Sequence, residues 1–293
     1  MAEVELVLDC CNTLGEGAIW NEADGRLWWT DIEGRRLWTL EPESGRSESH
    51  ETPERVGCFA PRRNGEGLVV AFTSGFALYD PATRQRQDIA AFEPDQPDTR
   101  LNDGRTDRRG RLIAGGFDEK GGGRLISSVV RLDSDLTVTT LLREVGCANG
   151  ICFSPDGRTL YFADSMRAEI WAFAYDPDTG RVGERRVVAR LKGSRPGIPD
   201  GSCVDAEGCI WNAEWDGGAV VRWTPDGRID RIVQLPVPRP TCVAFGGADH
   251  GILYITTARA WLSEAQLAKA PLSGGLFALE PGVKGVADAP FVG

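Results

Sequence analysis

Short apolar runs, rich in β-branched and aromatic residues, recur along the chain, and a polar turn that ends on glycine precedes each of them. The four clearest runs are Leu27–Asp31, Leu112–Gly116, Leu160–Asp164 and Cys209–Ala213. Including two weaker copies of the pattern, the turn glycines are Gly25, Gly65, Gly110, Gly157, Gly208 and Gly251. The runs are too short for helices and therefore predict strands. The spacing of 40 to 51 residues between successive glycines predicts a repeating architecture.

Further strand-like runs lie between these repeats. They include Gly75–Tyr79, Ile170–Tyr175 and Ala219–Trp223, and each leads into a turn that contains proline. Four strands in each of six units predict an all-β fold, a six-bladed β-propeller with four antiparallel strands per blade. We expect the N-terminal run Val4–Leu8 to pair with Gly275–Leu279 and close the ring, because an open sheet edge invites aggregation. A β-sandwich would not show this period, and a β-helix would repeat at a shorter one.

The composition indicates a single domain that spans residues 1–293. Apolar residues make up 41% of the chain, no stretch approaches 18 uncharged apolar residues, and the acidic N-terminus lacks the features of a secretory signal. The net charge of −10, from 33 basic and 43 acidic residues, argues against a nucleic-acid or membrane partner. The sequence therefore predicts a cytoplasmic protein, a monomer or weak homo-oligomer, with a small-molecule substrate.

Eight cysteines and two histidines limit the chemistry that the chain can perform. The cysteines lie in or beside apolar strands without a Cys-x-x-Cys pair, so we expect free, mostly buried thiols. His50 and His250 lie in polar or turn segments, and we expect both to face solvent. Serine–histidine and cysteine–histidine mechanisms therefore lack support, as does a zinc site of the usual histidine type. Catalysis would then depend on carboxylates, amides, arginine or lysine, and a metal bound through oxygen.

Four polar–glycine steps precede the clear turns and carry the candidate chemistry. Their polar residues lie eight or nine positions before the turn glycines and are Glu16, Asn102, Asn149 and Asp200. Equivalent positions of a propeller meet around its axis, so these oxygen-bearing side chains should converge. Each step alone could be a strand-entry turn, but four steps in register favour a metal site. Two carboxylates with amide oxygens suit one hard divalent cation; Ca²⁺ is favoured, and Zn²⁺, Mn²⁺, Mg²⁺ and Fe²⁺ are alternatives.

The same segments resemble a known enzyme family. In the family's order, they are Leu14–Trp20, Arg100–Gly104, Ala148–Gly150, Pro199–Gly201 and Leu253–Arg259. They resemble the senescence marker protein/gluconolactonase (regucalcin-like) family over about residues 14–280. The resemblance implies a six-bladed propeller with one catalytic divalent cation at the channel mouth, bound by Glu16, Asn149 and Asp200. It also implies that Asn102 lies at or beside the metal, that Arg100 faces the substrate, and that Asp200 is the general base.

One loop departs from the pattern of that family, in which it often supplies an acidic residue that holds a sugar hydroxyl. Here the loop is Gly116–Gly123, and counting from Gly110 places Lys120 at that position. Asp118 or Glu119 would take the position after a loop shift, or Lys120 would select a substrate with an extra carboxylate. A solvated loop is an equally good interpretation. Glu119 and Lys120 are thus both candidate substrate-binding residues, and the substrate stays open.

These observations predict metal-assisted hydrolysis of a sugar lactone, either an aldonolactone or a uronic or aldaric lactone, to the open-chain sugar acid. In this hypothesis the cation stabilises the oxyanion, Asp200 takes the proton of the attacking water, and Arg100 orients the sugar. Two alternatives are a phosphotriester or organophosphate hydrolase on the same scaffold and a non-enzymatic calcium-binding propeller. The fold alone does not decide between them.

Overall fold

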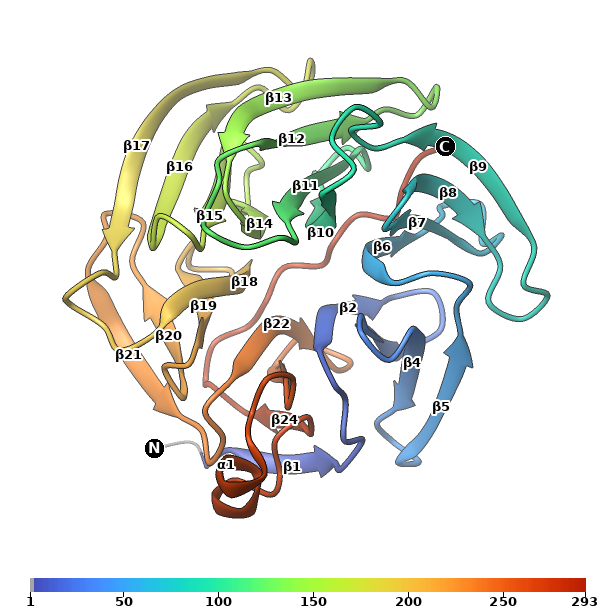
Figure 1. Cartoon of the computed structure of the whole chain (residues 1–293). Helices are drawn as coiled ribbons and strands as arrows, with labels where there is room; N and C mark the ends of the chain where they lie inside the picture. Colours follow the sequence, from blue (N-terminus) through green and yellow to red (C-terminus); the bar gives the residue numbers. More distant parts are fainter. Residues whose placement is uncertain (1–2) are drawn as a thin grey trace.

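Twenty-four β-strands form six four-stranded antiparallel sheets, arranged as a ring, in the computed structural model, which describes residues 3–293 (Figure 1). In the first five sheets the strand nearest the centre comes first along the chain, and the next three follow outward. The predicted six-bladed propeller with four antiparallel strands per blade is confirmed. The only helix among these residues, α1 (Glu264–Lys269), begins with a capping box at Ser263.

The strands of the first five blades follow one another along the chain. The first blade consists of β2 (Gly15–Asn21), β3 (Arg26–Asp31), β4 (Arg36–Glu41) and β5 (Arg46–Glu51). The second consists of β6 (Val56–Pro61), β7 (Leu68–Phe72), β8 (Gly75–Tyr79) and β9 (Arg86–Ala91). The third consists of β10 (Thr99–Thr106), β11 (Leu112–Asp118), β12 (Ser127–Leu132) and β13 (Val138–Val145). The fourth consists of β14 (Ala148–Phe153), β15 (Thr159–Asp164), β16 (Glu169–Tyr175) and β17 (Val182–Arg190). The fifth consists of β18 (Ile198–Val204), β19 (Ile210–Trp215), β20 (Ala219–Trp223) and β21 (Ile229–Gln234).

The sixth blade is built from both ends of the chain. From the centre outward it consists of β22 (Pro240–Gly246), β23 (Ile252–Thr257), β24 (Leu276–Leu279) and β1 (Glu5–Leu8). The predicted pairing of the N-terminal run with the last blade is confirmed, since β1 is antiparallel to β24 and Leu6 lies opposite Phe277. The innermost strand of this blade, β22, also packs beside β2 of the first blade.

The hydrophobic core lies between adjacent blades rather than at one centre. One buried cluster joins Ile170 of the fourth blade to Ile210 and Trp223 of the fifth. Five further clusters join the other neighbouring pairs, including the sixth blade with the first. The inner strands are mostly buried, whereas outermost strands such as β13 and β21 expose most of their side chains. Close packing on both sides therefore fixes the innermost strands around the axis.

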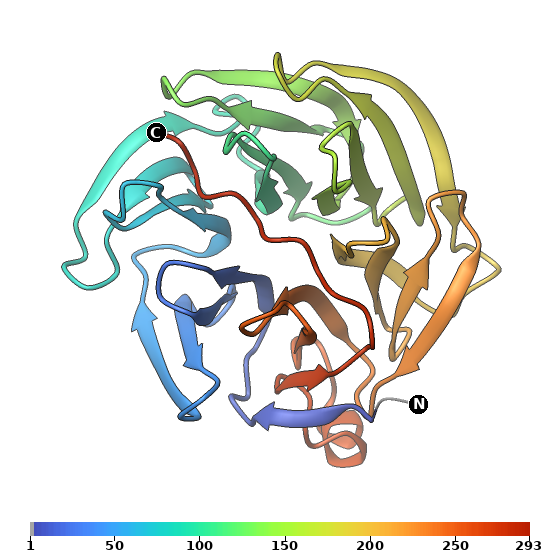
Figure 2. The same cartoon turned by 180° about the vertical axis from the view of Figure 1, so that it is seen from behind.

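The C-terminal segment, residues 284–293, crosses one face of the ring (Figure 2). Backbone hydrogen bonds tie its start to the fifth and sixth blades and its end to the second and third. Phe291 near its end is fully buried among residues of the second and third blades. Between these anchors Asp288 forms an ion pair with Arg105, a buried residue of β10. This segment, which no sequence pattern indicated, therefore covers one end of the innermost strands.

The predictions about cysteine and histidine have different outcomes. All eight cysteines are free and six are buried, as predicted. The expectation that both histidines face solvent is wrong: His50 and His250 are half-buried, and His250 Nε2 lies 3.0 Å from Glu22 Oε1. Part of the reason is the C-terminal segment, because Gly285 N donates a hydrogen bond to His250 O.

Among residues 3–293, no helix has the length and apolar character that crossing a membrane requires.

Candidate active site

The polar–glycine steps lie inside innermost strands, in the part of each strand away from the C-terminal segment. Glu16 belongs to β2, Asn102 to β10, Asn149 to β14 and Asp200 to β18. The other ends of these strands lead into the turns that the C-terminal segment covers (Figure 2). The steps are therefore parts of strands and not entry turns.

In every blade, the register between the innermost strand and the second strand shifts at one β-bulge. The four polar–glycine steps lie at the bulges of the first, third, fourth and fifth blades. In β14, for example, the shift lies between Asn149 and Cys152. A bulge leaves residues without a ladder partner and re-aims side chains that would otherwise alternate. Gly17 and Gly150 within these bulges both have a φ of 58°, in the left-handed region that favours glycine. In the first and fourth blades, the glycine of the step thus allows the bulge that presents the polar residue.

The carboxyl groups of Glu16 and Asp200 lie close enough to shift each other's pKa although their blades, the first and the fifth, are not neighbours. The two carboxyl groups therefore meet at the axis. Both side chains are buried. Burial raises the pKa of both groups, and the neighbouring carboxylates raise it further, since each is close to Asp103 and Asp200 is also close to Glu16.

Asp103 is a member of this acidic group that the sequence analysis did not select. It is buried on β10, next to Asn102, and burial raises the pKa of its carboxyl group. Its Oδ2 accepts a hydrogen bond of 3.1 Å from Ile151 N in the neighbouring blade. The signal in the sequence was the aspartate in the middle of the Asn-Asp-Gly step, a carboxylate directly after the selected amide.

Two asparagines continue the site toward the third and fourth blades. Asn102 Nδ2 donates a hydrogen bond of 3.1 Å to Asn149 Oδ1. Asn149 Nδ2 donates in turn to Ser165 Oγ at 2.8 Å, and Ser165 Oγ donates to Pro199 O, the carbonyl before Asp200, at 2.6 Å. These bonds connect the third, fourth and fifth blades, and they leave one lone pair of Asn149 Oδ1 free for a further partner.

Charged residues extend this network outward from Asn102. Arg100 is buried; its NH1 donates to Asn102 Oδ1 at 2.8 Å and its Nε donates to Glu119 Oε1 at 3.2 Å. Arg55 donates to both oxygens of Glu119, at 2.6 and 2.8 Å. Burial acts to raise the pKa of Glu119, but the hydrogen bond from Arg55 and the charge of Arg100 lower it overall. Glu119 is thus a carboxylate held between two guanidinium groups.

The three candidates of the loop lie in different surroundings. Lys120 Nζ lies 2.7 Å from Asp98 Oδ1, and 71% of the Lys120 side chain is exposed. Asp118 is buried and accepts hydrogen bonds of 2.8 and 2.6 Å from Arg124. Of the three, Glu119 is the residue that contacts Arg100, and through it Asn102.

The oxygen set at the axis fits a divalent cation. Among the described residues, no three His, Cys, Asp or Glu side chains are grouped to hold a metal by themselves, which agrees with a set whose third member is the Asn149 amide. Two ionised carboxyl groups buried this close to each other repel. Arg100 and Arg105, whose positive charges act on these acids, form ion pairs with other carboxylates. A divalent cation would offset the repulsion among the acids.

The second and sixth blades bring no ligand side chain to this level. The bulge residue of β6 is Gly57, and a Cβ there would lie 2.7 Å from Asn102 O. The corresponding residue of β22 is Thr241, whose hydroxyl hydrogen-bonds to Gly15 O and to Thr256 Oγ1. In these two blades, backbone contact and blade-to-blade hydrogen bonding take the place of ligands. The oxygen set therefore comes from the other four blades.

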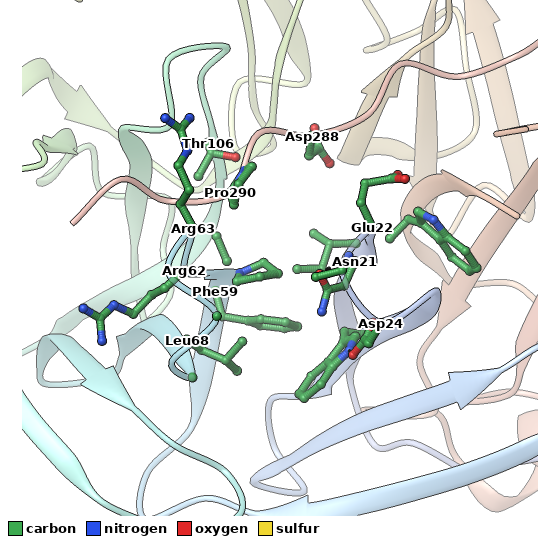
Figure 3. A pocket seen from close by; sticks show the side chains of 18 of the residues that line it. Asn21, Glu22, Asp24, Phe59, Arg62, Arg63, Leu68, Thr106, Asp288 and Pro290 are labelled. Atoms are coloured by element: carbon green, nitrogen blue, oxygen red, sulfur yellow. Dashed lines mark hydrogen bonds between the residues drawn. The ribbon is translucent and has the colours of Figure 1, made fainter. Parts of the chain in front are cut away.

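A separate cavity of about 530 Å³ lies between the first and second blades, at the end covered by the C-terminal segment (Figure 3). Trp28, Phe59 and Leu68 line it, together with Asp288 and Pro290 of that segment. None of the predicted site residues lines this cavity. It is therefore distinct from the candidate active site.

Comparison with known proteins assigns this arrangement to a family. A family model described as the SMP-30/Gluconolactonase/LRE-like region matches residues 14–259. The chain is 40% identical to L-arabinolactonase of Azospirillum brasilense, over 99% of this chain and 96% of the relative, and 36% identical to 6-deoxy-6-sulfogluconolactonase of Pseudomonas putida, over 96% of each. The structure of a calcium-binding protein, regucalcin from Agrobacterium tumefaciens, superposes with a TM-score of 0.93 at 33% identity and covers 100% of this chain and 98% of that one. Two of these relatives are named as lactonases, which agrees with the predicted enzyme class. The predicted family is confirmed: the chain belongs to the SMP-30/gluconolactonase family.

Proposed function

We propose that this protein hydrolyses a sugar lactone with the help of one divalent cation, most simply Ca²⁺, held by Glu16, Asn149 and Asp200. The observation that carries the proposal is the buried pair of Glu16 and Asp200, which meets at the axis without a basic partner. Such a pair costs stability unless a ligand compensates it, and perturbed acids of this kind gather at functional sites. Relatives named for lactones support the reaction, and a neighbour described as a calcium-binding protein supports the cation.

When bound, a divalent cation supplies a Lewis acid that stabilises negative charge on a substrate oxygen. The residues of the chain account for the proton movements. Asn212 Nδ2 donates to the backbone carbonyl of Asp200 at 2.7 Å and so fixes the strand at this residue. In the proposed mechanism the Asp200 carboxylate accepts a proton from the attacking water as the new carbon–oxygen bond forms. It then returns this proton to the ring oxygen as the ester bond breaks, which releases the open-chain acid.

Arg100, Asn102 and Glu119 are the proposed contacts for the sugar hydroxyls. The guanidinium and amide N–H groups can donate to hydroxyl oxygens, and the carboxylate can accept from hydroxyl groups. Because Arg100 bonds to both Asn102 and Glu119, the three side chains form one connected surface. Such a surface would orient a polyol ring before water attacks it.

We propose that the substrate is neutral, an aldonolactone rather than a uronic or aldaric lactone. Every basic side chain of the loop and its surroundings is already paired with an acid: Arg55 and Arg100 with Glu119, and Lys120 and Arg124 with Asp98. A carboxylate on the substrate would therefore meet the charges of Glu119 and Asp98 as well as those of the bases. A neutral ring avoids this repulsion.

A lactone panel assayed with metal-free protein and with added cations tests the proposal. We expect no turnover after exhaustive chelation, recovery on addition of Ca²⁺ or another divalent cation, and higher kcat/KM for neutral pentono- and hexonolactones than for lactones with a free carboxylate. Full activity of the metal-free protein would overturn the cation. Cation binding without hydrolysis of any lactone would overturn the reaction.

A further inference from the structure

Asp103 is a buried acid that neither the expected ligand set nor the substrate contacts include. It lies one residue after Asn102, on the bulge of β10, and only 5% of its surface is exposed. Its charge acts on both Glu16 and Asp200. A third acid this close to the pair makes the group more costly to bury, so its contacts require an explanation.

The hydrogen bond that the carboxylate accepts comes from the backbone of the neighbouring blade: Ile151 N donates to Asp103 Oδ2 at 3.1 Å. Gly150 and Ile151 are the two bulge residues of β14, which have no partner on β15 because the register passes from Asn149 directly to Cys152. Buried N–H groups without partners are costly, and here Asp103 supplies the acceptor.

The other two ligand strands satisfy their bulges differently. In β2, Gly17 N donates to Oε2 of Glu16 itself at 3.0 Å. In β18, the step residue Asp200 carries a carboxylate of its own next to the amide of Gly201, which favours the ionised form of that carboxylate. In β14 the step residue is an asparagine, and its side chain hydrogen-bonds instead to Ser165 and Asn102. The one ligand strand without a carboxylate of its own thus receives one from the adjacent blade.

We propose that Asp103 is the positioning residue of the cation site: it anchors the Asn149–Ile151 bulge and thereby aims the Asn149 amide at the axis. The hydrogen bond from Ile151 N ties the Asp103 carboxylate to this bulge, so it acts through Asn149 and not as a ligand. Its negative charge also favours a cation at the axis over an empty group of acids. This inference rests on the cation site of the proposed function.

The test compares cation binding by metal-free wild-type protein and variants, titrated with Ca²⁺ in a calorimeter. Asp103→Asn keeps the size and one acceptor but loses the charge, and we expect an affinity about tenfold weaker; Asp103→Ala loses both, and we expect about a hundredfold. Saturating Ca²⁺ should restore most turnover to Asp103→Asn. Asp107→Asn is the matched control, because Asp107 is also buried and accepts two backbone amides, at the other end of the same strand. It should lower the melting temperature and leave the affinity unchanged.

Three results would overturn the inference. Wild-type affinity in Asp103→Asn and Asp103→Ala would show that the residue positions nothing, and an equal loss in Asp107→Asn would show a general effect of stability. Water-proton relaxation with Mn²⁺ counts the waters on the cation, and an extra water in Asp103→Asn would make Asp103 a ligand. We expect the wild-type count in Asp103→Asn and an extra water in Glu16→Gln. If wild-type protein binds no divalent cation, the proposed function fails first; if only Glu16→Gln loses affinity, the inference fails alone.

Discussion

The two ends of the innermost strands differ in how their buried charges are paired. At the end covered by the C-terminal segment, the buried Arg105 pairs with Asp288, and Arg105 NH2 also donates to Ala18 O at 3.2 Å. At the other end Glu16 and Asp200 are buried together, and the charge of a third acid, Asp103, raises the pKa of both. The same strands run through both ends, so the difference lies in the residues at each end and in the C-terminal segment, which supplies Asp288.

This difference separates a structural end from a functional one. The buried charge of Arg105 is neutralised by Asp288, although Arg105 Nε has no hydrogen-bond partner among the described residues. Like charges that are buried together lack a compensating charge, and each raises the cost of ionising the other. Natural sequences keep such conflicts mainly where function requires them. The comparison therefore points to the Glu16–Asp200 end as the reactive one, and it can be tested from both sides.

The largest expected effect is a loss of turnover on substitution of Asp200, at the end where Glu16 and Asp200 lie. If Asp200 only binds the cation, saturating Ca²⁺ should rescue Asp200→Asn; if Asp200 is also the base, the saturated variant stays slow, because an amide cannot accept the proton of water. We expect kcat at saturating cation to fall about 10²- to 10⁴-fold. Rates measured over a series of Ca²⁺ concentrations check this, with Glu16→Gln as the ligand-only control. Substantial rescue of Asp200→Asn would remove it from the base role.

At the end covered by the C-terminal segment, substitutions should instead change the free energy of unfolding. Arg105→Met removes the buried partner of Asp288, whose side chain is 23% exposed and keeps Arg108 at 3.9 Å, so it should cost about 1–3 kcal/mol of unfolding free energy. Removing both charges, in Arg105→Met with Asp288→Asn, should cost less than Arg105→Met alone. By contrast, Glu16→Gln should leave the metal-free protein at least as stable as wild type, because it relieves repulsion. Urea unfolding of the metal-free proteins measures all three, and a loss in Glu16→Gln as large as that in Arg105→Met would abolish the distinction between the ends.

A smaller effect on activity is expected at the outer part of the network. Arg55 holds both oxygens of Glu119, so Arg55→Ala should let Glu119 turn away from Arg100. Loss of a charge-assisted contact corresponds to about 1.5–3 kcal/mol, or about ten- to a hundredfold in kcat/KM. We expect most of it in KM, since the cation ligands are untouched. Steady-state kinetics with a neutral lactone check this, and an unchanged KM would place Glu119 outside the substrate contacts.

The six blades and the residues at the axis could be predicted from the sequence. The contacts of Glu119 and the course of the C-terminal segment could not. Turns and strand periodicity are local, so the repeat at Gly25, Gly110 and Gly157 was enough to predict six blades of four strands. Glu16 and Asp200 follow from the same repeat, because equivalent positions of a propeller converge. The contact of Arg55 with Glu119 joins residues 64 positions apart in different blades, and no local pattern encodes it. The single-domain organisation, the cytoplasmic location and the weak or absent self-association stay predictions.

The smallest expected effect concerns Lys120, which the sequence left between a substrate-binding residue and a solvated loop. In the structure its ammonium pairs with Asp98, while Arg124 also binds that carboxylate. Loss of an exposed ion pair with a second cation still present should change little. We therefore expect Lys120→Ala to keep wild-type kcat/KM for a neutral lactone and for one with a free carboxylate, whereas Arg100→Ala should impair both. A selective loss with the carboxylate-bearing lactone would mean that Lys120 leaves Asp98 to meet the substrate, and it would replace the neutral lactone of our proposal with an acidic one.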